Sequence, residues 1–369
     1  MSESRVINFG AGPSALPDSV LQEAAKGLLN FNGTGMGIAE ISHRSKEFTA
    51  VLAELEGQIR TQLEGEGRAS SLRSFSTSLR AIRLLHPDLP DDGRAMDYVV
   101  TGSWSRKAAE EARRLGGGRV NVAVDARPYS KDGKSFDNIP AHDAYSFSPN
   151  PALIYYCENE TVDGVEFSND ASSPASFPFH LLQQNTLVPL VGDYSSSFMS
   201  RPIPRLADHA VVYAGAQKNI GPAGLTILIV RKDCIVDVDA AAKLGATPVP
   251  LTLAYKTLAD NNSELGGVKY YEEVNKRKAD KLYAVIKEGE AKSLFRAKVK
   301  EGSGSLMNVV FDVLGDGAEA KFISGAEARG MKAIKGHRSV GGIRISLYNA
   351  VTEEQTDTLI AYMKDFLAQ

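Results

Sequence analysis

The sequence predicts an α/β fold, with a large domain built on a mostly parallel sheet and a smaller α+β domain at the C-terminal end. Short apolar runs alternate with helical patterns through the first two thirds of the chain. This alternation is typical of parallel strands that are buried on both faces. Beyond about residue 255 charged helical patterns replace the apolar runs. At 369 residues, the chain is also longer than a single core usually grows.

The apolar runs are the candidate strands of the large domain. An amphipathic helix should precede them over residues 14–30, where Pro17 stands at the entry. A second helix is expected over residues 105–115, directly after the first run, because good helix formers with mixed charge follow one another there. Strand and helix therefore alternate, which favours a sheet with helices on both faces. The runs are 98–100, 120–124, 153–156, 187–191, 210–213 and 225–230.

The C-terminal part has the pattern of a second domain. Charged residues dominate a helical stretch over 269–290, and a strand is expected over 306–313. A last helix should begin at Glu353, because Thr352 and Gln355 have the spacing of a capping box. We expect a large domain over residues 14–255 and a small domain that combines residues 1–13 with 256–369.

Composition excludes several classes of protein. The net charge of −3 provides no field that would hold nucleic acid. Cys157 and Cys234 are the only cysteines, too few for a disulfide framework or a metal cluster, so a reducing compartment fits. The N-terminus has no apolar signal region, and no apolar stretch of about 18 residues could span a membrane. We therefore expect a soluble, cytoplasmic protein.

Two polar residues near the ends of apolar runs are candidates for chemistry. Asp193 follows the run at 187–191, and Lys218 follows the run at 210–213. The carboxyl ends of parallel strands meet at one edge of a sheet, so both residues would face one pocket. A partly desolvated lysine can act as nucleophile and proton carrier, and a carboxylate can pair with a protonated ring nitrogen. A solvated surface lysine and an aspartate that caps the next turn are the alternatives.

Four long motifs resemble those of the phosphoserine aminotransferases, a family of fold-type-I enzymes that use pyridoxal 5'-phosphate (PLP). They occur in the family's order and extend over nearly the whole chain. The resemblance implies a transaminase of L-serine biosynthesis that exchanges an amino group between glutamate and 3-phosphohydroxypyruvate. It also implies a homodimer with its sites at the subunit interface. The motifs are NFGAGP at 8–13, FNGTGMGIAEISHRSKEF at 31–48, AGAQKN at 214–219 and KGHRSVGGIRISLYNA at 335–350.

The same resemblance assigns residues to the cofactor. Lys218 would form the Schiff base with PLP, and Asp193 would face the pyridine nitrogen. Trp104, the only tryptophan, would stack on the ring. Thr161 matches a hydroxyl contact to the cofactor, and Gln217 matches a contact to its phosphate. Trp104 could instead pack against its own helix, and the two polar side chains could only satisfy nearby backbone groups.

Substrate residues follow from the resemblance in the same way. Arg344 matches the arginine that clamps an α-carboxylate, a task for which the planar guanidinium is suited because it donates two parallel hydrogen bonds. The second anion of the substrate, a phosphate or a side-chain carboxylate, would meet His43, Arg44, His337 and Arg338. Without the resemblance, each His-Arg pair reads more simply as exposed charge.

Two segments depart from the family pattern. Where the family has a strand and then consecutive glycines that hold the PLP phosphate, residues 66–86 are rich in Ser and Arg and read as an exposed basic loop or helix. After Ser263 the family's Asn-Thr-Pro-Pro segment is missing. One alternative is therefore a cofactor-impaired splice, frame-shift or degenerate variant. Another is a different fold-type-I enzyme, such as a cysteine desulfurase or an alanine–glyoxylate aminotransferase.

Overall fold

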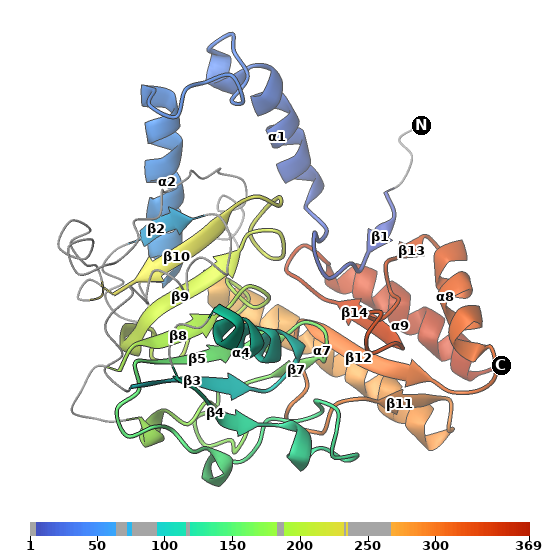
Figure 1. The fold of residues 1–369 in the computed structure, drawn as a ribbon. Helices are drawn as coiled ribbons and strands as arrows, with labels where there is room; N and C mark the ends of the chain where they lie inside the picture. Colours follow the sequence, from blue (N-terminus) through green and yellow to red (C-terminus); the bar gives the residue numbers. More distant parts are fainter. Residues whose placement is uncertain are drawn as a thin grey trace.

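A seven-stranded sheet lies at the centre of the larger part of the molecule (Figure 1). The structure is a computed structural model that describes residues 5–63, 72–75, 94–115, 119–182, 188–231, 234 and 267–369. In spatial order the strands are β2 (Leu72–Phe75), β10 (Thr226–Val230), β9 (His209–Gly215), β8 (Leu190–Asp193), β5 (Leu153–Cys157), β3 (Ala95–Val100) and β4 (Arg119–Asp125). Neighbours from β9 to β4 are parallel, whereas β10 is antiparallel to both β9 and β2. The predicted mostly parallel α/β fold is confirmed.

The apolar runs of the sequence lie in these strands. Every residue of β5 is buried, as is every residue of β9 except Gly215. A strand whose two faces both meet protein requires apolar residues throughout, and this requirement made the runs visible in the sequence. The strand predicted at 187–191 begins too early in the sequence, because β8 begins at Leu190.

Helices cover both faces of the sheet. α4 (Ser103–Leu115) packs on one face, where Ala109 and Ala112 join a core with Tyr155. α2 (Lys46–Leu63) contributes to the core of the opposite face, which contains the alternate residues of the same strands. The cores on the two faces fix the sheet between them. Its carboxyl edge is therefore rigid where Asp193 ends β8.

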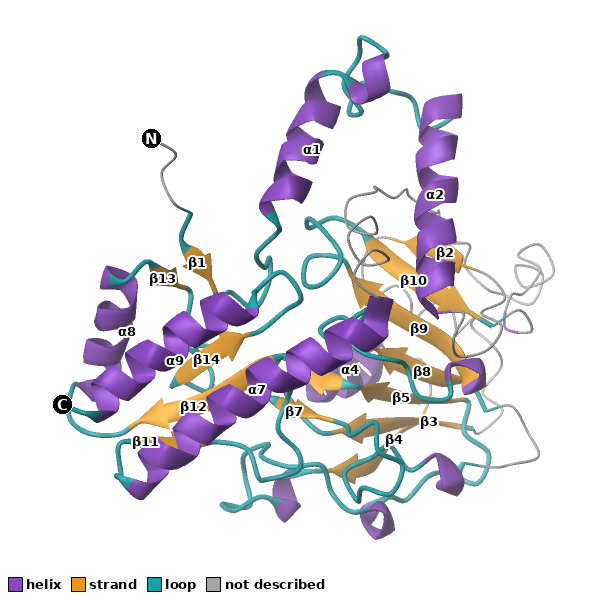
Figure 2. Cartoon of the chain, turned by 180° about the vertical axis from the view of Figure 1, so that it is seen from behind, coloured by secondary structure: helices purple, strands orange, loops and turns teal. Residues whose placement is uncertain are grey.

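A smaller antiparallel sheet organises the C-terminal part. Its strands are β11 (Phe295–Ala297), β12 (Asn308–Val313) and β14 (Ile343–Ser346). Its helices are α7 (Gly267–Ala291), α8 (Ala318–Ala328) and α9 (Glu353–Leu367), and Figure 2 shows α7 running from the large sheet toward β11. β1 (Ile7–Asn8) pairs in parallel with β13 (Met331–Lys332), and the next residue, Phe9, is buried in this core. The boundaries at residues 13 and 255 stay a prediction, because residues 235–266 lie outside the described part.

The last helix begins as the sequence predicts. The backbone N–H of Gln355 donates to Thr352 Oγ1 at 3.1 Å, and the backbone N–H of Thr352 donates to Gln355 Oε1 at 3.1 Å. These two hydrogen bonds form the expected capping box, with Thr352 as the N-cap of α9.

The N-terminal helices form an arch that rises from the body of the molecule (Figures 1 and 2). α1 (Asp18–Leu29) and the 3-10 helix η1 (Phe31–Gly33) make one side, and α2 makes the other. Val20 is the one buried residue of α1, while Leu28 and Leu29 are 58% and 82% exposed. A row of exposed leucines on an amphipathic helix is typical of a surface that contacts another chain. Among the described helices, none is long and apolar enough to cross a membrane.

Short elements complete the fold and correct one expectation. Residues 66–86 were expected to form a basic loop or helix, but residues 72–75 form β2, because the free edge of β10 accepts a further strand. The rest of that segment and the residues after Ser263, up to 266, lie outside the described part. The remaining elements are β6 (Asn159–Glu160), β7 (Val165–Glu166), η3 (Arg127–Tyr129), η4 (His142–Ala144), η5 (Phe179–Leu181) and η6 (Leu206–Asp208).

Candidate active site

Lys218 lies just beyond the end of β9 and points its amine at the β6–β7 hairpin. Its Nζ donates a hydrogen bond to Thr161 Oγ1 at 2.7 Å. The N-terminal segment fixes the lysine from the other side, since the backbone N–H of Ser14 donates to the Gln217 carbonyl at 2.9 Å. The hydroxyl of Ser14 donates to the Lys218 carbonyl. These contacts hold the half-buried lysine at a defined position.

The surroundings of Lys218 determine the charge of its amine. Burial lowers the pKa of Lys218, and the positive charge of Arg344 lowers it further. The negative charge of Asp193 and the acidic group of Glu160 act in the opposite direction. A lysine whose ammonium is destabilised by burial provides more of the neutral amine that acts as a nucleophile.

Asp193 ends β8 beside β9, so it faces the same edge of the sheet as Lys218. Its Oδ2 accepts hydrogen bonds from the Tyr213 hydroxyl at 2.8 Å and the Tyr155 hydroxyl at 3.4 Å. Its Oδ1 accepts from the backbone N–H of Ser195 at 2.9 Å, which is the turn cap considered as an alternative. Burial and the charge of Asp193 raise the pKa of both tyrosines. The phenols therefore stay protonated and act as donors.

Trp104 lies in the first turn of α4, with its side chain 44% exposed. Its backbone N–H donates to Glu160 Oε2 at 2.8 Å, and Lys107 Nζ lies 4.6 Å from its ring centroid. The ring thus contacts Lys107 of its own helix and is also partly exposed, so it stays a candidate to stack on a ligand. Burial and the neighbouring Asp163 raise the pKa of Glu160 to about 7.

Arg344 lies in β14 and carries an unused hydrogen-bond donor. Its Nε is buried and has no hydrogen-bond partner in the part of the chain that the structure describes. Burial is the main cause that lowers the pKa of His337. The positive charge of Arg344 is the next cause, and Arg338 adds to this effect. The structure therefore brings His337 and Arg338 close to Arg344, and Arg344 in turn lies close enough to Lys218 to lower its pKa. An unpaired guanidinium in a cationic surrounding is a site for an anion.

His43 and Arg44 lie elsewhere. Both are exposed, on the segment at the top of the arch between η1 and α2 (Figures 1 and 2). Neither is among the charges that shift the pKa of Lys218 or His337.

Comparison with known proteins identifies the family. A model of the class-V aminotransferases matches residues 6–359. The chain is 37% identical to phosphoserine aminotransferase 2 of Arabidopsis thaliana, a chloroplastic protein, over 100% of this chain and 86% of the relative. It is also 37% identical to the phosphoserine aminotransferase of Pseudomonas aeruginosa strain PAO1, over 98% of each. The chain belongs to the class-V aminotransferases, among the phosphoserine aminotransferases.

Solved structures of this family have the same fold. The phosphoserine aminotransferase of Bacillus circulans matches with a TM-score of 0.83 at 30% identity, over 99% of each chain. The PLP-bound enzyme of Trichomonas vaginalis matches with a TM-score of 0.78 at 30% identity, over 98% of this chain and 100% of the other. An alanine–glyoxylate aminotransferase from Nostoc is 14% identical, a likeness that concerns the fold alone.

The family membership answers several expectations. The chain is a fold-type-I transaminase, and its cofactor is PLP. The full-length matches do not support the alternative of a degenerate or mis-spliced variant. The described residues also fit the cofactor chemically. They supply an amine at Lys218, a carboxylate at Asp193 and an exposed flat ring at Trp104. Gln217, the predicted phosphate contact, is half-buried next to Lys218.

The sequence did not reveal the residues that support this aminotransferase site. Tyr155 and Tyr213 lie inside apolar runs, and only the strand register shows that Tyr213 is opposite Asp193. A hydroxyl-bearing aromatic near the carboxyl end of a buried strand was the available signal. Glu160 precedes the predicted contact Thr161 in the sequence, and its carboxylate caps the helix that carries Trp104.

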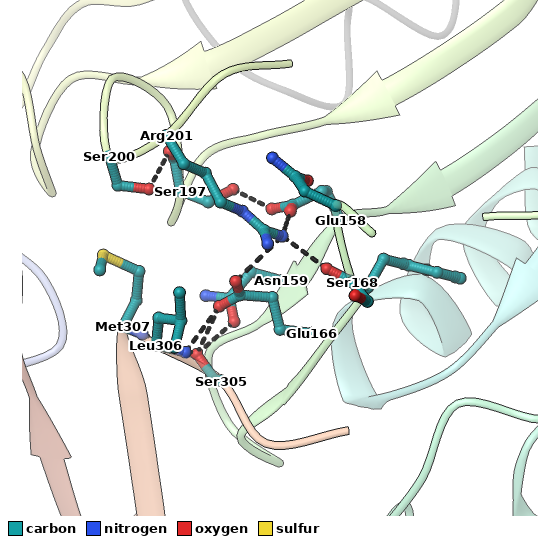
Figure 3. A network of polar contacts seen from close by, with 12 residues as sticks. Glu158, Asn159, Glu166, Ser168, Ser197, Ser200, Arg201, Ser305, Leu306 and Met307 are labelled. Carbon is teal, nitrogen blue, oxygen red and sulfur yellow. Dashed lines mark hydrogen bonds and ion pairs between the residues drawn. The ribbon is translucent and has the colours of Figure 1, made fainter. Parts of the chain in front are cut away.

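A buried guanidinium fixes the hairpin that carries Thr161 (Figure 3). Arg201 forms ion pairs with Glu158 and, at 2.9 Å, with Glu166. Glu166 in turn accepts a hydrogen bond from the backbone N–H of Leu306 at 2.9 Å, just before β12. The hairpin of this aminotransferase is therefore attached both to the loop after Asp193 and to the smaller sheet.

Proposed function

We propose that this chain is a phosphoserine:2-oxoglutarate aminotransferase. It transfers an amino group between glutamate and 3-phosphohydroxypyruvate in L-serine biosynthesis. Relatives with this name match over the whole chain. The observation that carries the proposal is the hydrogen bond from Lys218 to Thr161 at the edge of the sheet where Asp193 also lies.

The cofactor residues have separate tasks in this proposal. Bound PLP supplies an electron sink that makes the Cα–H bond of the substrate acidic. Lys218 attaches the cofactor. Its amine then takes the proton from the substrate Cα and returns a proton in the second half of the amino-group transfer. Asp193 holds the pyridine nitrogen in its protonated form, while Trp104 lies against the ring. Thr161 and Gln217 hold the cofactor's hydroxyl and phosphate.

The cationic residues recognise the substrates, all of which are small molecules with at least two anionic groups. Arg344 holds the α-carboxylate, because its buried Nε has no acceptor among the described residues. His337 and Arg338 hold part of the distal anion, the phosphate of phosphoserine or the side-chain carboxylate of glutamate. His43 and Arg44 complete that site from a second copy of the chain.

A homodimer accounts for the arch. α1 leaves Leu28 and Leu29 exposed, and Met36 near the top of the arch is 48% exposed. Apolar surface of this kind is buried when two copies pack against each other. The arch of one copy can then carry His43 and Arg44 toward the site of the other. We place the enzyme in the cytoplasm.

Steady-state kinetics test the proposed reaction. Initial rates with glutamate and 3-phosphohydroxypyruvate should give parallel double-reciprocal lines, because the amino group stays on the enzyme between two half-reactions. A Lys218→Ala chain, which lacks the attachment point, should show no turnover under the same conditions. Intersecting lines, which indicate a ternary complex, or turnover by Lys218→Ala would contradict the mechanism.

A further inference from the structure

Two acidic side chains of the β6–β7 hairpin hold the start of α4, the helix that carries Trp104. Glu160 Oε2 accepts a hydrogen bond from the backbone N–H of Trp104 at 2.8 Å, and Glu160 Oε1 accepts from that of Ser105 at 2.8 Å. Asp163 Oδ2 accepts from the backbone N–H of Ser103 at 2.6 Å, and its Oδ1 accepts from the Ser103 hydroxyl at 3.1 Å. The first N–H groups of a helix have no partner within the helix. Here three of them donate to one hairpin, which lies 55–60 positions later in the chain.

A side chain next to the helix would make a simpler cap. Helices often begin with a Ser, Thr, Asp or Asn whose side chain binds the first N–H groups. Gly102 stands directly before α4, and a Cβ built on it would lie 2.3 Å from the Glu160 side chain, so the hairpin carboxylate fills the place of a local cap. Glu160 and Asp163 are buried, with 0% and 6% of their surface exposed, and burial of a carboxylate costs free energy. Capping of a helix alone does not explain this arrangement.

The hairpin that carries the two acids is itself held in place. The backbone N–H of Gly164 donates to the Glu160 carbonyl at 2.8 Å and closes the turn. The ion pairs of Arg201 anchor the same hairpin. Thr161 lies in this turn, between the two acids in the sequence, and its Oγ1 accepts the hydrogen bond from Lys218 Nζ. The same turn therefore sets both the position of Thr161 and the position of the start of α4.

We propose that Glu160 is a positioning residue of the cofactor site, which holds the Trp104 ring at a fixed place relative to Lys218. Its two carboxylate oxygens bind consecutive N–H groups, so the start of α4 cannot turn or shift without breaking one of these bonds. The Trp104 side chain is 44% exposed, so packing covers only part of the ring and the backbone beneath it determines where the ring lies. The inference deepens the proposed function, on which it rests for the stacking of Trp104 on PLP.

Amide substitutions separate this role from the capping of a helix. In Glu160→Gln one carboxylate oxygen becomes an NH2 group that faces a backbone N–H, so two donors meet and one hydrogen bond is lost. In Asp163→Asn the remaining oxygen still accepts from the Ser103 N–H, and the new NH2 group donates to the Ser103 hydroxyl, which is also an acceptor. Both variants remove one buried acid from the same hairpin. Only Glu160→Gln loosens the start of α4 at Trp104, so Asp163→Asn is the matched control.

The first measurement follows the Trp104 ring in the full chain freed of PLP. Trp104 is the only tryptophan, so the tryptophan fluorescence reports on this residue alone. The experiment is done at pH 8, above the pKa of Glu160, which burial raises to about 7. Time-resolved anisotropy separates fast local motion of the ring from the tumbling of the whole molecule. The residual anisotropy after the fast decay should fall in Glu160→Gln and stay unchanged in Asp163→Asn.

The second measurement is the affinity for pyridoxamine 5'-phosphate, the amino form of the cofactor, which has no aldehyde and forms no bond with Lys218. Calorimetric titration of the PLP-free chain gives its Kd. In Glu160→Gln this Kd should rise about five- to a hundredfold, because binding has to bring the relaxed start of α4 back into place without its acceptor. In Asp163→Asn it should change by less than about twofold. Neither measurement needs turnover, so both outcomes are independent of whether phosphoserine is the substrate.

Glu160→Asp provides a second arm if Glu160→Gln does not fold. It keeps the acidic group near Lys218, but a side chain that is one methylene shorter cannot reach both N–H groups of α4. It should therefore lower the residual anisotropy and raise the Kd in the same direction. A folded Glu160 variant in which either quantity is unchanged overturns the proposal. Equal effects of Asp163→Asn and Glu160→Gln overturn it as well, because they would reduce the role of Glu160 to capping of the helix.

Discussion

At the scale of single residues, Arg344 needs a bound ligand to complete its hydrogen bonding. Within the described ranges its buried Nε has no acceptor, and such a donor costs free energy in the free protein. A bound carboxylate removes this cost and adds charge-assisted hydrogen bonds. The same residue lowers the pKa of Lys218, so its charge acts on both the substrate and the catalytic amine.

Arg344→Lys should reduce kcat/KM for glutamate strongly, although the substitution keeps the positive charge. An ammonium cannot form the two parallel hydrogen bonds of a guanidinium, and the loss of one charge-assisted bond corresponds to about ten- to a hundredfold in efficiency. Initial rates at varied glutamate concentration measure the effect. Arg296→Lys is the control, because this arginine is exposed and pairs with Asp312 at 2.7 Å. Unchanged efficiency in Arg344→Lys would show that Arg344 is not the clamp.

At the scale of secondary-structure elements, the β6–β7 hairpin depends on a buried ion cluster. Arg201 is 7% exposed and lies between the carboxylates of Glu158 and Glu166, which are 2% and 4% exposed. Burial raises the pKa of Glu166 to about 7 and lowers that of Arg201 to about 10. One cation thus compensates two buried acids, and the position of Thr161 depends on it.

Arg201→Met should destabilise the protein by about 3–5 kcal/mol, because it removes the cation that pairs with two buried carboxylates. The effect should depend on pH. A buried acid whose pKa is raised in the folded state is neutral in both states at low pH, and its cost grows as the pH rises from about 4.5 through the raised folded value. Thermal unfolding at pH 5 and pH 8 should show the larger loss at pH 8.

The control for this pH effect is Arg277→Met. Arg277 is an exposed arginine that pairs with Glu353 at 3.0 Å, and such pairs contribute about 0–1 kcal/mol. It should change the unfolding temperature little at either pH. Equal losses at pH 5 and pH 8 in Arg201→Met would mean that the two carboxylates are not the cause.

The elements differ in how far the sequence predicts them. The capping box of α9 is local, since Thr352 and Gln355 stand three positions apart and need no other part of the chain, and it was predicted correctly. The buried strands were visible because a parallel sheet demands apolar runs. The pairing of Arg201 with Glu158 and Glu166 depends on loops that the sequence does not place. β2 was missed because an edge strand needs only backbone partners.

The candidate site shows the same contrast. Lys218, Asp193 and Arg344 were predicted from motifs, and their side chains do share one part of the molecule. The hydroxyl of Tyr213 was not predicted, because its contact with Asp193 depends on strand register. A hydrogen bond between residues far apart in the chain leaves no local pattern.

At the scale of the whole molecule, the two His-Arg pairs are the central question. His337 and Arg338 lie near Arg344, whereas His43 and Arg44 belong to the exposed segment between η1 and α2. The exposed leucines of α1 form the surface through which we propose that the arch contacts another chain. If two copies exchange their arches, each site combines Lys218 of one copy with His43 and Arg44 of the other.

Hybrid dimers test this arrangement directly. A Lys218→Ala chain and a His43→Ala/Arg44→Ala chain, with different affinity tags, should each be nearly inactive alone. Their purified heterodimer should regain about half of the wild-type activity, because one of its two sites combines an intact lysine with an intact arch. A heterodimer of the wild-type chain with a chain that carries all three changes should be inactive, since each site then lacks one component. The reverse pattern, with the second hybrid active and the first inactive, would place His43 and Arg44 in the site of their own chain.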